Sequence, residues 1–191
     1  FKSKAAIISV AFLLPLVAML YFQWSSATAQ LAFTRSERQG IEYLRPLLDL
    51  IKAAQDRRSA ATFKSPELAE LQQKVAAAML RLEAKQGEMG TGFGTGEAFA
   101  EFKKRHDALM QPGPAARPDE IFALHGEYLT AALELIPIVA NRSQLTLDPE
   151  LDTFHMMNMV VVHGPTQTEN TAKLAVLGTL LVIAVIGGVL V

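Results

Sequence analysis

Cysteine is absent from this chain of 191 residues. Its absence excludes disulfide bonds, thiolate metal sites and a cysteine nucleophile. A large net charge of either sign is also lacking, because 18 lysines and arginines stand against 19 aspartates and glutamates, which leaves −1. Nucleic-acid-binding domains usually carry a basic stripe, so we expect no nucleic-acid partner. The sequence contains neither a nucleophile elbow nor a zinc-binding H-E-x-x-H, and we expect a protein that is not an enzyme and uses no cofactor.

Glycine is concentrated in one stretch, GEMGTGFGTG, at residues 87–96. A G-x-G-x-x-G fragment binds phosphate when a strand precedes it and a helix follows. No strand is predicted before this stretch, because the preceding sequence has helical periodicity. We therefore predict a flexible turn that ends a helix.

Two uncharged runs carry much of the hydrophobic excess of the chain, whose mean hydropathy is +0.22. The first run, residues 5–22, is long enough to cross a bilayer. Lys2 and Lys4 precede it, and Trp24 follows in the manner of an interfacial aromatic belt. A signal peptide is the alternative. The length of the run, its bulky aromatic end and its continuation as helix favour a membrane span.

The second run, residues 174–191, reads LAVLGTLLVIAVIGGVLV and is also long enough to span. Two spans place both ends of the chain on one side, which the N-terminal lysines predict to be cytoplasmic. We therefore predict spans at residues 1–23 and 173–191 in a bacterial inner membrane, with a periplasmic sensor domain at residues 24–172. The chain begins at Phe1 rather than Met and stops inside an apolar run, so we expect an output region after Val191.

The region between the spans has helical periodicity and few breaks. One helix is predicted to continue from the first span to about residue 61, with Pro46 bending it. Residues 66–86 and 97–110 are predicted to form two pieces of one descending limb. A third limb follows Pro118, and a fourth follows Pro149 and returns to the membrane. The predicted fold is all-α, an antiparallel four-helix bundle flanked by two transmembrane helices.

Charged and polar residues cluster near the predicted membrane-distal turns. Arginines beside helix ends hold small anions, so we predict a ligand site there. The alternative is that these residues cap helices and form surface ion pairs. The predicted site consists of Arg57, Arg58, Asn141, Arg142, Asp148 and Asp152.

Methionine and histidine are concentrated near the start of the last limb. His155, Met156 and Met159 are followed by His163. Thioether and imidazole ligands together suit copper, so metal sensing is one reading of this segment. The reading we favour has the methionines in the bundle core and the histidines at its edge. We predict no metal site.

Two longer stretches carry a family resemblance. The first span runs into SERQGIEYLRPLLDLIKAAQDRRSAA, and NRSQLTLDPELDTFHMMNMVVVHGP follows later. Together they resemble the periplasmic sensor region of bacterial methyl-accepting chemotaxis proteins and related membrane transducers. The residues around 37–38 and 55–58 are similar to the helical nitrate- and nitrite-sensing type of domain. The resemblance covers residues 1–165.

The resemblance implies a homodimer, a small-molecule ligand and a helix shift that passes through the spans. Similar input regions occur on sensor histidine kinases and diguanylate cyclases, so the output stays open. Such sensors usually continue further after residues 147–153 before the second span, and we expect residues to be missing there or the domain to be trimmed. The alternative class is a helical membrane adaptor that binds another protein.

Overall fold

The computed structural model describes residues 2–111, 117–146 and 151–189, and this part of the chain contains helices and no strand. The prediction of an all-α chain is confirmed for these residues. The elements, in chain order, are α1 (Lys2–Thr62), α2 (Leu68–Phe93), α3 (Gly96–Met110), α4 (Pro118–Arg142), α5 (Leu151–Met157), the π-helical segment η1 (Asn158–His163) and α6 (Gly164–Val189).

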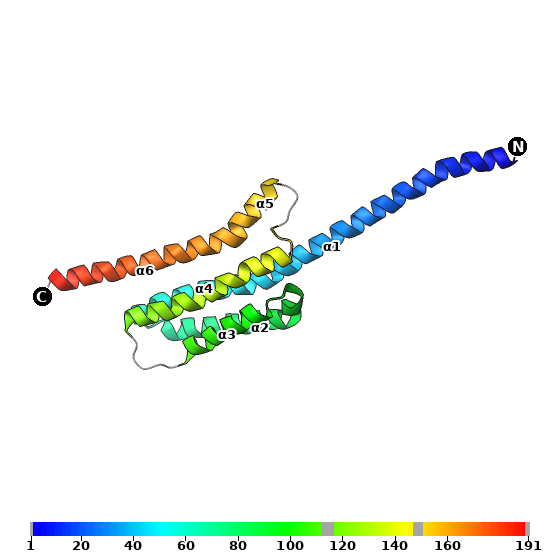
Figure 1. The fold of residues 1–191 in the computed structure, drawn as a ribbon. Helices are drawn as coiled ribbons and strands as arrows, with labels where there is room; N and C mark the ends of the chain where they lie inside the picture. The colour runs from blue at the N-terminus through cyan, green and yellow to red at the C-terminus, as the bar shows by residue number, and fades with distance from the viewer. Residues whose placement is uncertain (1, 112–116, 147–150, 190–191) are drawn as a thin grey trace.

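Helix α1 is a single rod of 61 residues that contains both Pro15 and Pro46 without ending at either. Its first half extends alone from the rest of the molecule, and its second half enters the packed body (Figure 1). The solitary half exposes large apolar side chains such as Phe12 and Trp24. The predicted continuity between the first apolar run and the helix that follows it is therefore present.

The glycine stretch does not end α2 at residue 86 as predicted, because the helix continues to Phe93. The reversal falls at Gly94, whose φ of +65° is a left-handed conformation that glycine adopts without a steric penalty. The backbone N–H of Thr95 then donates to the Gly90 carbonyl at 3.1 Å, which closes the turn. As a result α2 and α3 run in opposite directions (Figure 1) and are not two pieces of one limb.

One core joins the second half of α1 to α2, α3 and α4. Its aromatic centre is Phe102 of α3 stacked on Tyr128 of α4, with ring centroids 5.1 Å apart. The largest buried apolar side chains are Tyr43, Leu47 and Leu50 of α1, Leu82 of α2, Phe102 of α3, Tyr128, Leu129, Leu135 and Ile136 of α4, and Leu145 after α4. The buried hydroxyl of Tyr43 donates to Gln86 Oε1 at 2.6 Å, so this polar group is satisfied within the core.

Among the described residues, three helices are long and apolar enough to cross a membrane: α1, α4, and the helix formed by α5, η1 and α6. The apolar window of α4 is 39% buried, whereas those of the other two are 0% and 6% buried. Because α4 places its apolar face in the core, we assign it to the packed body. The other two contain the predicted spans, and this supports membrane character for the chain.

Helix α6 runs beside the C-terminal end of α1 and in the same direction, so the two ends of the described chain lie at opposite ends of the molecule (Figure 1). The predicted return of the last limb toward the first span is therefore wrong for this arrangement. The reason lies in the hairpin at Gly94, which adds one reversal to the predicted sequence of limbs. With that reversal α4 runs opposite to α1, and α6 again runs in the direction of α1.

Candidate functional site

Two consecutive arginines near the end of α1 are buried, Arg57 with 8% and Arg58 with 0% of its surface exposed. Consecutive residues of a helix point about 100° apart, so the two guanidinium groups enter different surroundings. Arg57 meets α2, α3 and α4. Arg58 meets α6 and α4. Buried charges are uncommon unless they are paired, and these two residues define the polar centre of the molecule.

Arg58 forms a bidentate ion pair with Glu169 of α6. Its Nη1 lies 2.6 Å from Oε1 of the carboxylate, and its Nη2 lies 3.1 Å from Oε2. The Glu169 side chain is 2% exposed, so both charges are shielded from water. Gln55 Nε2 donates to the same Oε2 at 3.0 Å. This fork geometry gives strong and directional recognition of a carboxylate.

The face of the Phe122 ring on α4 completes the surroundings of Arg58. The guanidinium carbon lies 5.1 Å from the ring centroid, a distance at which a cation is attracted by the ring electrons. Lys173, one turn after Glu169, brings its Nζ to 3.5 Å from Oε1. The Arg58 Nε is buried without a hydrogen-bond partner. The C-terminal end of α1 is thus joined to α6 by charge as well as by packing.

Arg57 has a different set of partners, none of them acidic among the described residues. Its Nη1 donates to His125 Nε2 at 2.7 Å, and its Nη2 lies 3.4 Å from Gln72 Oε1 and 3.5 Å from the Leu109 carbonyl. Its Nε is buried and has no partner. Burial lowers the pKa of Arg57. The group is a desolvated cation with unused hydrogen-bonding capacity.

The protonation state of His125 follows from its two contacts. The Ile121 carbonyl, 2.8 Å from Nδ1, can only accept a hydrogen bond, so Nδ1 carries the hydrogen. The Nε2 atom is then free to accept from Arg57. Burial lowers the pKa of His125 from 6.5 to about 4, and the positive charges of Arg57 and Arg58 act in the same direction. His125 is therefore neutral at physiological pH and serves as an acceptor for Arg57.

The structure does not bring the six predicted site residues together. Arg57 and Arg58 lie near the C-terminal end of α1. Asn141 and Arg142 end α4 at the other end of the packed body, where the next residue, Ser143, lies against Gly40. Asp152 is exposed on α5. Asp148 lies outside the described residues.

The reason for this separation is the direction of α4. The predicted topology placed the end of that helix at the membrane-distal turns, but the extra reversal at Gly94 places it beside Gly40. Asn141 instead accepts a hydrogen bond from Thr146 Oγ1 at 2.8 Å, a local contact after the helix end.

Two residues of the cluster, Glu169 and His125, were not predicted as site residues. A signal for Glu169 was present in the sequence: it is the only acidic residue of α6, and Lys173 is the only basic one. A single acid inside a largely apolar helix is expensive to bury without a partner. The sequence around His125 gave no comparable indication, because no local pattern shows that a residue 68 positions earlier, Arg57, is its neighbour.

The methionine-rich segment also differs from its predicted packing. Met157 packs against the core, but Met156 and Met159 are 62% and 64% exposed, and His155 and His163 are exposed as well. The favoured reading, which placed the methionines in the core, is therefore correct only for Met157. Among the described residues no group of three or more histidine, aspartate and glutamate side chains could hold a metal ion.

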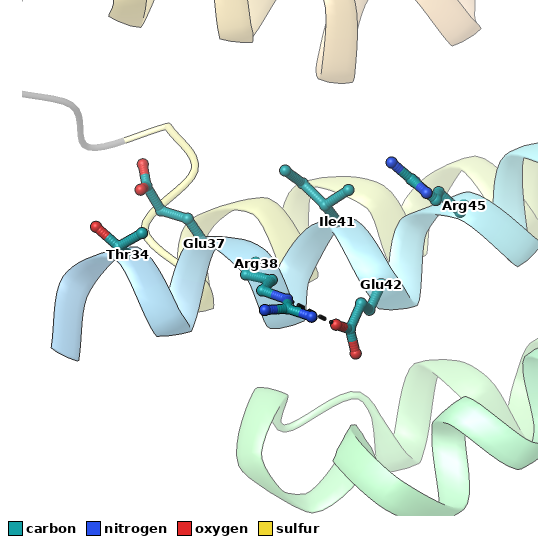
Figure 2. Close-up of a pocket in the computed structure, with 6 residues that line it drawn as sticks. All are labelled: Thr34, Glu37, Arg38, Ile41, Glu42 and Arg45. Carbon is teal, nitrogen blue, oxygen red and sulfur yellow. Dashed lines mark hydrogen bonds and ion pairs between the residues drawn. The ribbon is translucent and has the colours of Figure 1, made fainter. Parts of the chain in front are cut away.

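A surface depression lies on α1 near the start of the packed body (Figure 2), and neither buried arginine lines it. It is lined by Thr34, Glu37, Arg38, Ile41, Glu42 and Arg45. All of these residues belong to one helix, and Arg38 pairs with Glu42 across the floor at 3.1 Å. A hollow with one wall cannot enclose a small ligand, so we do not assign a ligand site to it.

Comparisons of the chain with models of known protein families, with curated proteins and with solved structures found no match.

Proposed function

We propose that this chain is the sensory and membrane-spanning part of a bacterial signal transducer and that its helical domain binds a small anionic ligand. The observation that carries the proposal is the buried arginine pair. It lies on the helix that contains the first apolar run, and one of its members is joined to the helix that contains the second. A ligand that alters this joint changes the relation between two membrane helices, which is the requirement for a transmembrane signal.

In this proposal α1 to α4 form an antiparallel four-helix sensor in the periplasm, and the two apolar runs lie in the inner membrane. The antiparallel order of these helices and their common core support the first part. The two lysines before the first run support a cytoplasmic N-terminus. The output attached to such a sensor is a chemoreceptor signalling region, a histidine kinase or a diguanylate cyclase.

Arg57 is the group that we assign to the ligand. A buried cation without an acidic partner is destabilising, and an anion placed beside it removes that penalty. The unsatisfied Nε of Arg57 supplies a donor, and Gln72 supplies a polar neighbour on α2. His125 holds the guanidinium in place while staying neutral, so it adds no second positive charge at physiological pH.

The partner that we assign to the solitary part of α1 is a second copy of the chain. Apolar residues there recur with the alternating spacing of three and four that marks a coiled-coil seam, at Leu20, Trp24, Ala27 and Leu31. Leu20, Trp24 and Leu31 are 62%, 75% and 57% exposed. A single helix in water is only marginally stable, and anchoring of both copies in one membrane makes their stalks parallel. These features support a homodimer.

The proposal is tested by thermal unfolding of the full chain in lipid nanodiscs with a panel of small anions, amino acids and organic acids. At 100 times its dissociation constant a ligand stabilises by about 2.7 kcal/mol. For a chain of this size that raises Tm by roughly 5–10 °C. The shift should disappear in Arg57→Met and persist in Arg81→Met, a matched control because Arg81 is exposed on α2. If no compound in the panel shifts Tm, the proposal that this domain senses a ligand is overturned.

One observation favours the second candidate, a membrane adaptor that binds another protein. Met156, Met159 and Val160 form an exposed apolar patch around η1, with 62% to 65% of each side chain accessible. A protein partner covering this patch would remove apolar surface from water. For an adaptor, the panel should give no thermal shift, and Met159→Glu should prevent binding of the partner.

A further inference from the structure

The surroundings of Glu169 amount to a carboxylate-binding site whose occupant is part of the chain. Arg58 supplies the two parallel donors, at 2.6 and 3.1 Å, and Gln55 supplies a third at 3.0 Å. Phe122 lies under the guanidinium at 5.1 Å. All three residues belong to α1 or α4, which are part of the packed body. Only the carboxylate comes from α6.

Helix α6 is held on the body by few contacts. Among its residues with described side chains, only Pro165, Glu169 and Val176 are buried. The apolar residues after Lys173 are mostly exposed, including Leu174 at 70% and Leu181 at 65%. Exposed leucines are stabilised by transfer to a bilayer. The docked position of α6 therefore depends strongly on the ion pair between Arg58 and Glu169.

The docked position also conflicts with insertion of both apolar runs into one membrane. At 1.5 Å per residue, Phe22 lies roughly 54 Å before Arg58 along α1. Leu174 follows Glu169 by roughly 8 Å in the same direction. The two runs are therefore separated by more than the thickness of the hydrocarbon core, about 30 Å. For α6 to enter the membrane that holds the start of α1, Glu169 must leave Arg58.

Departure of Glu169 leaves Arg58 without a counter-ion inside the packed body. Removing one partner of a buried pair is strongly destabilising, because the remaining charge has lost both water and its neighbour. A molecule that supplies a carboxylate with the same two oxygens restores the fork and the bond from Gln55. It therefore stabilises the state in which α6 is free.

We propose that the site formed by Arg58, Gln55 and Phe122 binds a carboxylate ligand and that Glu169 is its internal competitor. Binding of the ligand displaces Glu169 and releases α6 to the membrane. This inference rests on the proposed sensory function. It assigns a carboxylate ligand to Arg58, separate from the anion assigned to Arg57, and gives the means by which that carboxylate acts. Because Glu169 occupies the site in part of the molecules, the apparent Kd of the ligand equals its intrinsic Kd divided by the fraction of molecules in which the site is free.

The first experiment measures binding of acetate and succinate to the full chain in nanodiscs by calorimetry, for the native sequence and for Glu169→Gln. The amide keeps the shape of the side chain but not its charge, so the competitor is weakened. The apparent Kd for both carboxylates should fall at least tenfold in Glu169→Gln. Arg58→Lys keeps the positive charge and loses the fork, and it should weaken carboxylate binding at least tenfold.

The second experiment follows the position of α6 with spin labels on Asp49→Cys and Thr171→Cys, two exposed sites on α1 and α6 in a chain without native cysteine. Dilution with unlabelled protein restricts the measured distances to one copy. Succinate should shift the distribution toward longer distances, and Glu169→Gln should do so without ligand. A distribution that neither change alters overturns the release of α6.

The outcomes separate this inference from the proposed function. If nitrate or sulfate raises Tm through Arg57 while carboxylates bind equally to the native chain and to Glu169→Gln, the sensor remains and the internal competitor is overturned. If neither protein binds any anion or carboxylate of the panel, both proposals are overturned. A carboxylate that binds more tightly to Glu169→Gln and lengthens the label distance supports both.

Discussion

Arg57 and Arg58 are adjacent in the chain, yet of these two only Arg58 has a carboxylate partner among the described residues. Arg57 faces the neutral ring of His125, with 2.7 Å between Nη1 and Nε2. Both side chains are buried. Arg58 is thus a paired buried charge and Arg57 an unpaired one. Replacement of each arginine should therefore change the free energy of unfolding by different amounts.

Replacement of Arg57 by methionine should leave the free energy of unfolding within about 1 kcal/mol of the native value. Loss of its hydrogen bonds is offset by removal of an unpaired buried charge. Replacement of Arg58 by methionine should cost up to about 3–5 kcal/mol while Glu169 stays buried, and less if α6 is released. Denaturant unfolding of the two variants in a mild detergent measures the difference. Equal losses would contradict the assignment of the two roles.

Acidification should destabilise the fold through His125. The pKa of His125 is about 4 in the fold because of burial, against 6.5 in the unfolded chain. The unfolded chain therefore binds more protons between these values, and stability falls as pH decreases from about 6.5 to about 4. The full loss is about 3 kcal/mol, at 1.36 kcal/mol for each pKa unit. Burial also lowers the pKa of His106, which adds to the loss in the same direction.

The measurement is the free energy of unfolding at several pH values, for the native chain and for His125→Gln. Carboxylates also titrate in this range, so the difference between the two proteins isolates His125. The native chain should lose more stability than the variant as pH falls. Parallel pH profiles would show that His125 does not carry this dependence.

Gly40 is a second position with a sharp expectation, because a Cβ there would collide with the Ser143 side chain and lie 2.8 Å from Leu145 Cδ1. Gly40→Ala should therefore separate α1 from the segment that follows α4 and cost about 1–3 kcal/mol. A Cβ added at Gly126, inside α4, would meet nothing within 4 Å. Gly126→Ala should stabilise by up to about 1 kcal/mol through helix propensity. Thermal unfolding of both variants checks the opposite signs, and two losses of equal size would contradict the close packing at Gly40.

The sequence was sufficient to predict the helical class, the two apolar runs and the continuation of the first run into a long helix. Each of these follows from composition and periodicity within one segment. The hairpin between α2 and α3 was not predicted, because a glycine-rich break does not show whether the next helix continues or reverses, and any of several glycines could adopt a positive φ. Only Gly94 does so among the described glycines. The reversal at Gly94 replaced a predicted continuation of one limb, which changed the number of limbs and hence the direction of α6.

The candidate site shows the same division between local and long-range information. Arg57 and Arg58 were predicted because they lie near the predicted membrane-distal end of the first limb, where an arginine can hold a small anion. Their partners were not predicted, because Glu169 lies 111 residues after Arg58 and His125 lies 68 residues after Arg57. Contacts across such separations depend on topology, and the topology depended on one turn.

Cross-linking of the solitary part of α1 tests the homodimer. Leu31→Cys lies on the apolar seam, and Ala29→Cys lies on the opposite side of the same turn. The chain has no native cysteine, so each variant carries a single thiol. In nanodiscs with a mild oxidant, Leu31→Cys should form a disulfide-linked dimer, because seam positions of parallel coiled coils face each other. Ala29→Cys should stay monomeric on a non-reducing gel. Equal dimer formation by both variants would indicate random collision in the membrane and would remove the support for a specific seam.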